Sequence, residues 1–261
     1  MPPAQQALAD SNDIILSRFG TQQTDDANVV TGILGHNHEF RAFASELGIV
    51  LAPRVLHGAD TTGFGGFEFT VDAGQTSISH DKSYWRVLES SANPGAGDGT
   101  SHGASQLRTV GLFARKGLWF PAPGAEIGLG GVHIQDSGMY AGQAYLKFAL
   151  YEGFHDSPVP SIALRLAGSR LYGAQDLDLT VGAIDVTISK HLGIAGPFRV
   201  EPYFNYGLVF IVPRSQVLEG TPNIDPLDPG SDADNNLNFV LRDQNAIVRQ
   251  RAEFGLRFEL A

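Results

Sequence analysis

Apolar and charged side chains alternate residue by residue along the end of the chain, from Ile247 to Leu260. One parity is mostly apolar, and the other carries five charged side chains. Successive side chains of a β-strand point to opposite faces, so the pattern predicts a strand with one apolar and one charged face. At about 3.3 Å per residue this strand would be roughly 45 Å long, which is enough to cross a bilayer on a tilted path. The pattern therefore predicts a transmembrane β-strand.

Alternating segments with turn-forming residues between them recur from residue 41 onward. Their connections alternate between short ones and longer ones, and the longest connections are 91–104 and 214–238. Outer-membrane barrels have short periplasmic turns, longer extracellular loops and an even number of strands, with both termini on the inner side. We therefore predict an all-β fold: an antiparallel transmembrane up-and-down β-barrel of about ten strands, within a range of about 8 to 12. The predicted strands cover roughly 42–54, 63–78, 82–90, 105–117, 124–134, 138–151, 160–168, 177–190, 198–213 and 239–260.

Two domains are predicted. Residues 1–40 form an N-terminal periplasmic extension, in which Leu8, Ile14, Ile15, Leu16 and Phe19 line one side of a short helix. Residues 41–261 form the outer-membrane β-barrel. Within it, Gly130 and Gly131 shift the phase of the alternation and predict a β-bulge.

The polar parity of these strands predicts a charge network in the lumen. Ten strands leave at most a narrow path, and charges of both signs in so small a lumen are expected to pair. A plugged or narrow barrel is the first interpretation, and a path for small solutes between opposed acidic and basic ladders is the alternative. The predicted network consists of Glu46, Glu68, Asp72, Arg86, Arg115, Glu126, Lys147, Arg165, Asp185, Arg199, Glu201, Arg249, Arg251, Glu253, Arg257 and Glu259.

Composition narrows the class of protein further. Although 43% of the residues are hydrophobic, no run of about 18 apolar residues predicts a transmembrane helix. The formal net charge is −10 without a basic cluster, which argues against a nucleic-acid partner. Cysteine is absent, so disulfides and thiolate chemistry are excluded. Aromatic residues expected at the membrane interfaces are Trp85, Trp119, Phe120 and Tyr206.

Three local motifs contain residue types that are typical of metal binding or catalysis. His36 and His38 have the spacing of a metal pair but lack an evident third ligand, and His155-Asp156-Ser157 is too compact for a hydrolase triad. The acidic segment 214–238 partly follows the pattern of a calcium loop, but a solvated extracellular loop is the simpler interpretation. We therefore expect no enzyme activity, no metal and no cofactor.

The strand sequence PYFNYGLVFIV and the terminal FGLRFEL carry a resemblance to bacterial outer-membrane β-barrel proteins over about residues 41–261. In size and character the chain also resembles the porin-like outer-membrane components of myxobacterial gliding machines. The resemblance implies a location in the outer membrane of a Gram-negative bacterium, with the signal peptide already removed. The expected function is a non-enzymatic anchor or docking component of a cell-envelope assembly, whose partners are outer-membrane lipid and periplasmic or outer-membrane proteins. A porin-like channel is the alternative, followed by an outer-membrane hydrolase.

Overall fold

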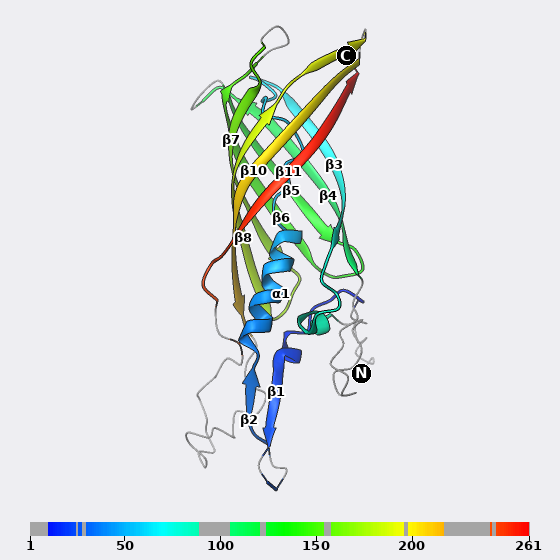
Figure 1. Ribbon diagram of the computed structural model, residues 1–261, viewed down its shortest axis with the longest axis vertical. Coiled ribbons are helices and arrows are strands. Elements are labelled where there is room, and N and C mark those ends of the chain that lie inside the picture. The colour runs from blue at the N-terminus through cyan, green and yellow to red at the C-terminus, as the bar shows by residue number, and fades with distance from the viewer. Residues whose placement is uncertain are drawn as a thin grey trace, which may run out of the picture.

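The computed structural model describes residues 10–24, 26–27, 30–88, 105–120, 124–153, 158–195, 198–216, 241 and 244–260. Its main element is one antiparallel sheet that curls around the molecule (Figure 1). Eight strands are paired in the order β11-β10-β8-β7-β6-β5-β4-β3, and the short β9 (Leu192–Ala195) pairs with the start of β10. The bounds are β3 (Phe67–Ser77), β4 (Gln106–Leu118), β5 (Ala125–Ile134), β6 (Tyr140–Tyr151), β7 (Ser161–Tyr172), β8 (Leu177–Ser189), β10 (Phe198–Ser215) and β11 (Ile247–Leu260).

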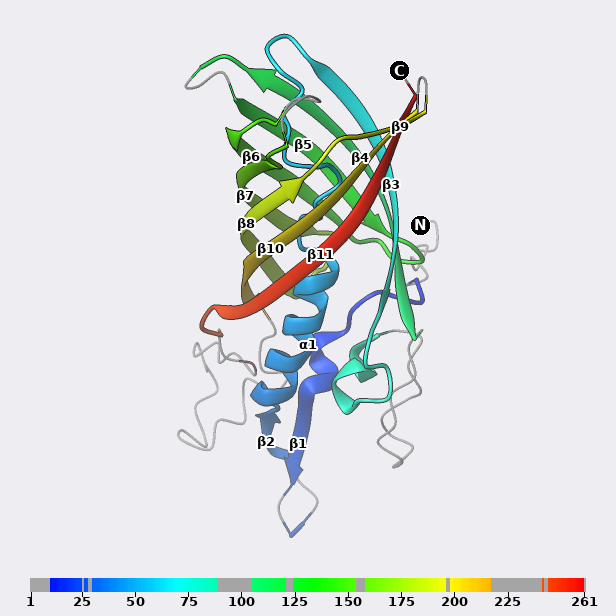
Figure 2. The ribbon, with the colours of Figure 1, turned by 45° about the horizontal axis from the view of Figure 1, so that its top comes forward.

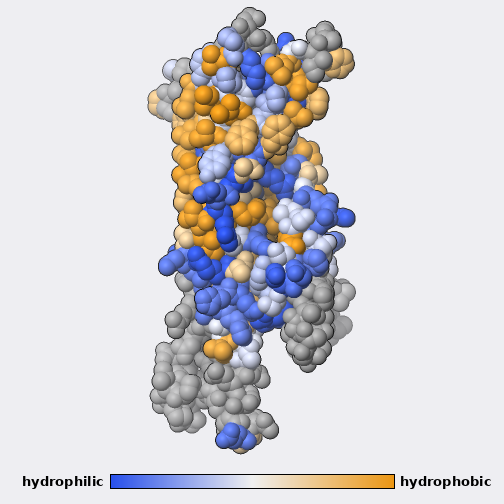
Figure 3. All heavy atoms as spheres, in the orientation of Figure 1, coloured by the Kyte–Doolittle hydropathy of each residue, from blue (hydrophilic) through white to orange (hydrophobic). Residues whose placement is uncertain are grey.

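The sheet has an apolar outer face and an inner face that is charged over part of its length. On the outside, Phe69 is 69% exposed and Phe254 is 72% exposed, whereas Glu126 and Asp185 on the inside are completely buried. This is the reverse of a soluble β-protein, whose apolar side chains fill the interior. Hydrophobic residues cover much of the strand-built part of the molecule, and hydrophilic residues gather toward the end that contains α1 (Figure 3).

The curl remains open along one edge in the described pairing. Between β3 and β11 the described residues form no ladder of backbone hydrogen bonds, so the closed barrel expected from the sequence is matched only as a curled all-β sheet. An ion pair spans this edge, because Arg257 Nη2 on β11 lies 3.2 Å from Glu68 Oε2 on β3. The edge strands therefore approach each other through side chains.

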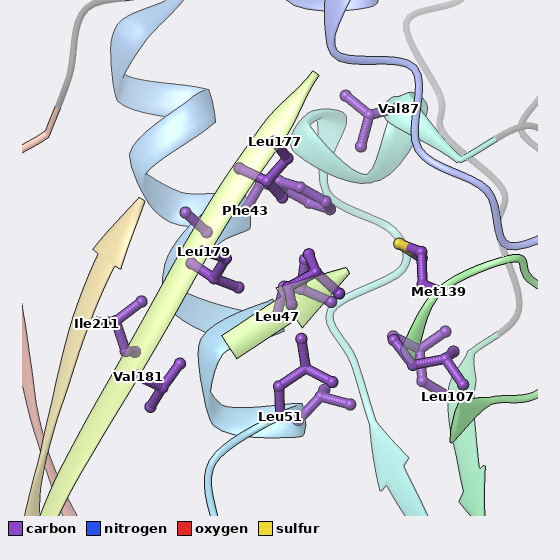
Figure 4. Close-up of a cluster of buried hydrophobic side chains, with 14 of the residues drawn as sticks. Phe43, Leu47, Leu51, Val87, Leu107, Met139, Leu177, Leu179, Val181 and Ile211 are labelled. Atoms are coloured by element: carbon purple, nitrogen blue, oxygen red, sulfur yellow. The ribbon is translucent and has the colours of Figure 1, made fainter. Parts of the chain in front are cut away.

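Helix α1 (Asn37–Val50) fills one end of the curl, where a strand over 42–54 was expected. That prediction is wrong because Phe40, Phe43, Leu47 and Leu51 recur at helical spacing and are all buried. They pack against the inner faces of β8 and β10 to form the apolar core (Figure 4). A Cβ at Gly48 would lie 2.5 Å from Ile211 Cγ2, so glycine is needed for this close approach. Among the described residues no helix is long and apolar enough to span a membrane.

The remaining N-terminal elements lie beyond α1, at the end of the sheet opposite the C-terminus (Figure 1). They are the 3-10 helix η1 (Leu16–Phe19) and a hairpin of β1 (Gly20–Thr24) and β2 (Val30–Gly35). The helix predicted around Leu8–Phe19 is therefore reduced to η1, and Leu8 lies outside the described residues. The strand predicted at 82–90 is also wrong, because its centre forms the 3-10 helix η2 (Ser83–Val87), which is buried against α1.

Strand β5 keeps a regular register with both neighbours, so the bulge predicted at Gly130 and Gly131 is wrong. The change of phase has another cause. Glu126 faces the charged part of the interior, while Ile134, on the same inward parity, belongs to the apolar core around α1. The chemistry of the inner face changes along the strand without any change of backbone phase.

Candidate functional site

The interior next to α1 is occupied by residues 51–66, which we call the internal segment. It leaves the end of α1, runs inside the curl toward the end where the C-terminus lies, and there enters β3 (Figure 2). Hydrogen bonds of 2.8–3.1 Å attach its backbone to the strands along its length. In order they join Gln143 to the Leu51 carbonyl, Tyr203 to the Val55 carbonyl, Ser189 to the Ala59 amide and Gly117 to the Gly66 carbonyl.

Asp185 organises the first charged cluster on the inner wall. Its carboxylate lies 3.2 Å from Arg165 Nη1 and 3.0 Å from Arg251 Nη2. Both guanidinium groups also donate to the carbonyl oxygen of Pro53, at 3.2 and 3.0 Å. Because the buried cations have both a carboxylate and a carbonyl as partners, this part of the wall holds the internal segment rather than lining an open path.

Glu126 organises the second cluster. Its carboxylate pairs with Arg115 Nη1 at 3.3 Å and with Lys147 Nζ at 3.1 Å, and it accepts hydrogen bonds from the Thr62 amide and the Tyr145 hydroxyl at 2.9 Å each. All four partners are on the inside of the sheet, and the Glu126 side chain is fully buried. One carboxylate therefore links β4, β6 and the internal segment.

Lys147 extends the same cluster to the internal segment. Its ammonium group donates to the carbonyl of Asp60 at 2.8 Å and lies 3.3 Å from the carbonyl of Gly58. A pocket remains between the internal segment and the wall, lined among others by His57 and Arg115, and its volume is about 20 Å³. Such a volume holds about one water molecule. The internal segment thus fills the interior, for which the sequence allowed either a plugged lumen or a narrow path for solutes.

The structure places every predicted lumen charge except Glu46 and Arg86 on the inward parity of the sheet. Many of them meet in the clusters around Asp185, Glu126 and Glu68. Arg249 instead reaches α1 and donates to Ser45 Oγ at 2.7 Å. Arg199 is also on the inward parity, but within the described part of the chain its side chain has no ion pair with these clusters.

Glu46 and Arg86 are corrections to the predicted network, because neither lies on a strand. Glu46 is on α1, and its carboxylate accepts hydrogen bonds from the Ser79 amide at 3.0 Å, the Tyr84 hydroxyl at 2.7 Å and Trp85 Nε1 at 2.8 Å. Arg86 is on η2 and pairs with Glu39 of α1. Both charges fasten η2 to α1 outside the curl.

The predicted interfacial aromatics divide in the same way. Trp85 is a correction, because its ring is completely buried and packs edge-on against Phe43 at 5.1 Å between centroids. Trp119 and Phe120 follow the end of β4 and are exposed. Tyr206 is on the outer face of β10, and its hydroxyl contacts Gln250 on β11.

The internal segment itself was not predicted from the sequence. Its residues do not alternate, but Pro53, Gly58 and Gly63 interrupt any regular element there, and that irregularity could have marked it as neither strand nor helix. Of the weighed motifs, His36 bonds Thr21 at 2.7 Å at the base of the hairpin. His155 and Ser157, and nearly all of the acidic loop within 214–238, lie outside the described residues.

Glu46 supplies a test of how η2 is fastened to α1. Burial raises the pKa of its carboxyl group, but hydrogen bonds from Ser79, Tyr84 and Trp85 outweigh burial and hold the pKa below its usual 4.5. A lowered folded-state pKa stabilises the protein fully above about pH 4.5, and this contribution is lost as the pH falls through the folded pKa. We expect Glu46→Gln to lower the free energy of unfolding at pH 7 by about 1–3 kcal/mol.

The measurement is the unfolding free energy of wild type and Glu46→Gln between pH 7 and pH 3. The difference between the two proteins should begin to shrink below about pH 4.5, where Glu46 becomes protonated in the unfolded chain, and should be lost once the pH falls below the lowered pKa of the folded protein. Asp81→Asn is the control, because Asp81 is exposed and its carboxylate forms a long ion pair of 3.8 Å with the exposed Lys82. A difference that stays constant over this range would contradict the role of the charged form.

The fold and its interior define an all-β protein in which a curled antiparallel sheet encloses a charged cluster and its own internal segment. Comparison of the chain with family models, with curated proteins and with solved structures finds no match. The function of this chain is therefore inferred from its own sequence and geometry.

Proposed function

We propose that the protein is a transmembrane β-barrel of a Gram-negative outer membrane, closed by its internal segment, that anchors and displays its N-terminal elements as a docking site of a cell-envelope assembly. The observation that carries this proposal is the occupied interior: buried charges on the wall hold the internal segment, so the barrel serves as an anchor rather than as an open pore. No enzymatic role is proposed.

The exposed apolar belt supports the membrane location. Large side chains such as Val71, Leu112, Leu129 and Phe258 are more than half exposed on the outer face of the sheet. Monomeric soluble proteins rarely expose contiguous apolar patches larger than a few hundred Å². In a bilayer these apolar side chains would contact lipid instead of water, while the charged inner face stays enclosed.

The position of the N-terminal elements changes the proposed orientation. The two long connections between neighbouring strands, 28 residues from β3 to β4 and 31 residues from β10 to β11, leave strand ends on the side of α1. At the other end, where β11 ends, the connections have six to nine residues (Figure 1). Outer-membrane barrels have short turns and the C-terminus on the periplasmic side. We therefore orient α1 and the β1–β2 hairpin toward the cell exterior, instead of the periplasmic side expected from the sequence.

Single cysteines test this orientation, because the natural chain has none. Asp26→Cys places a thiol at the tip of the β1–β2 hairpin, and Pro158→Cys places one in the short connection between β6 and β7. A membrane-impermeant maleimide should label Asp26→Cys in intact cells, and should label Pro158→Cys only after the outer membrane is permeabilised. Both substituted positions are exposed, so the two variants are matched in accessibility.

The reverse labelling pattern would place the docking elements in the periplasm and overturn the display at the cell surface. A second arm tests the closed lumen with the same unlabelled protein in a planar bilayer. Inserted protein should show no discrete openings. Ion-selective openings would favour the porin-like channel and remove the basis for a pure anchor.

A further inference from the structure

Three side chains that suit a metal ion meet near the C-terminal end of the sheet. Asp60 belongs to the internal segment, His191 to the connection after β8, and Glu201 to β10. One ligand atom from each lies within 4.8 Å of the others. His191 Nε2 is 2.7 Å from Asp60 Oδ2 and 3.6 Å from Glu201 Oε1. His191 and Glu201 are ten residues apart in the sequence, and folding brings the distant Asp60 to them.

The two carboxylates are incompletely satisfied by the described residues. The Glu201 side chain is 2% exposed, and its Oε1 atom, which faces His191, has no hydrogen-bond partner within the described part of the chain. The Asp60 Oδ1 atom is in the same state. A buried carboxylate oxygen without a partner is costly. His191 Nε2 is close enough to Asp60 Oδ2, at 2.7 Å, for a hydrogen bond. Its distance of 3.6 Å to Glu201 Oε1 is too long for one.

We propose that Asp60, His191 and Glu201 bind a divalent transition-metal cation of the zinc class. One imidazole nitrogen and two carboxylate oxygens suit zinc, whereas calcium and magnesium prefer ligand sets made of oxygen alone. Ligand atoms about 2.0–2.2 Å from a tetrahedral zinc ion lie about 3.3 Å apart. The observed separations of 2.7 and 3.6 Å from the histidine nitrogen fall on either side of that value.

The site would fasten the internal segment to the wall. Asp60 is on the internal segment, while His191 and Glu201 are on the sheet side, so a shared cation joins the two. Lys147 already holds the Asp60 carbonyl from within the sheet. A Cβ at Gly58 would lie 1.7 Å from Glu201 Oε1, so only glycine leaves room for that carboxylate beside the internal segment.

The test measures zinc binding by calorimetry to the full chain, folded in detergent and stripped of metal with a chelator. Wild type should bind one zinc ion per chain. Binding should weaken at least tenfold in His191→Ala and in Glu201→Gln, whose side chain is close to glutamate in size. His133→Ala is the matched control, because His133 bonds the Met139 carbonyl near the α1 end of the sheet and should leave binding unchanged.

Folding of each variant is checked by the shift in gel mobility between heated and unheated samples. Zinc should also raise the unfolding temperature of wild type and of His133→Ala, and leave that of His191→Ala unchanged. Folded wild type that binds no zinc, or folded His191→Ala that binds it as tightly as wild type, would overturn the site. These results do not depend on the orientation of the barrel or on its partners.

Discussion

Glu126→Ala should be among the most destabilising single substitutions in this chain, with an expected loss of about 3–5 kcal/mol in the free energy of unfolding. The substitution leaves Arg115 and Lys147 buried without their shared carboxylate. It also removes the acceptor of the Thr62 amide and the Tyr145 hydroxyl. Removing one partner of a buried ion pair costs more than the pair contributed, because the remaining charge is left in a poorly solvated interior.

The measurement is chemical unfolding in detergent or lipid vesicles, with Glu126→Gln and Asp81→Ala as companions. Glu126→Gln keeps the size of the side chain and loses the charge, so its expected loss lies between wild type and Glu126→Ala. Asp81 is 69% exposed, and its substitution should change stability by at most about 0.5 kcal/mol. A loss for Glu126→Ala no larger than that of Asp81→Ala would show that the interior charges are hydrated rather than clustered.

Long alternation is what made most of the strands predictable. β10 follows the predicted segment 198–213, and β11 ends as predicted but begins at Ile247, eight residues after the predicted start at 239. Both strands were predictable because their parity is kept over at least seven side chains on each face, and a one-residue slip would exchange the two faces. The error at 42–54 arose because Leu47, Ile49 and Leu51 also share a parity. A segment of that length fits both the strand period of 2 and the helix period of 3.6. The burial of Phe40 and Phe43, which distinguishes the helix, is known only from the structure.

The alternation of side chains also predicted which charges face inward, but it did not predict the partners of these charges. Arg165 bonds the carbonyl of Pro53, which is 112 residues away in the sequence. No local pattern encodes that contact, because the internal segment is irregular and its backbone groups supply the acceptors. Asp60 and His191 were missed for the same reason, since both lie outside any regular strand, whereas Glu201 was predicted as an inward charge but not as a metal ligand.

The alternation of side chains predicted a lumen that is charged along its whole length, whereas the interior has an apolar part and a charged part. Residues such as Leu179 and Ile211 share the inward parity with Asp185 and Glu201, yet they pack on α1. The inward faces of β8 and β10 therefore change from apolar to charged along the strand, with α1 beside the apolar part and the internal segment beside the charged part. The two parts divide the tasks: the apolar core positions α1, and the charged clusters hold the chain that leads from it.

Leu166→Arg should separate a lipid-facing belt from an exposed surface in water. Leu166 lies in the middle of β7 with its side chain 43% exposed on the outer face, between Leu146 of β6 and Ile184 of β8. Arginine at the midplane of a bilayer costs about 2–4 kcal/mol in a transmembrane barrel, and about 0–1 near the interfaces. On a surface exposed to water, the same change would cost little and would improve solubility.

The matched control is Tyr172→Arg, at the end of the same strand and on the same parity, 45% exposed. Folding into lipid vesicles, followed by urea titration, should give a loss of about 2–4 kcal/mol for Leu166→Arg and at most about 1 kcal/mol for Tyr172→Arg. Equal and small losses would argue that the apolar belt faces protein or water, and the anchor would then need a different support. A loss of stability that is larger for Leu166→Arg than for Tyr172→Arg would report on the surroundings of the outer face, because both side chains point away from the charged interior.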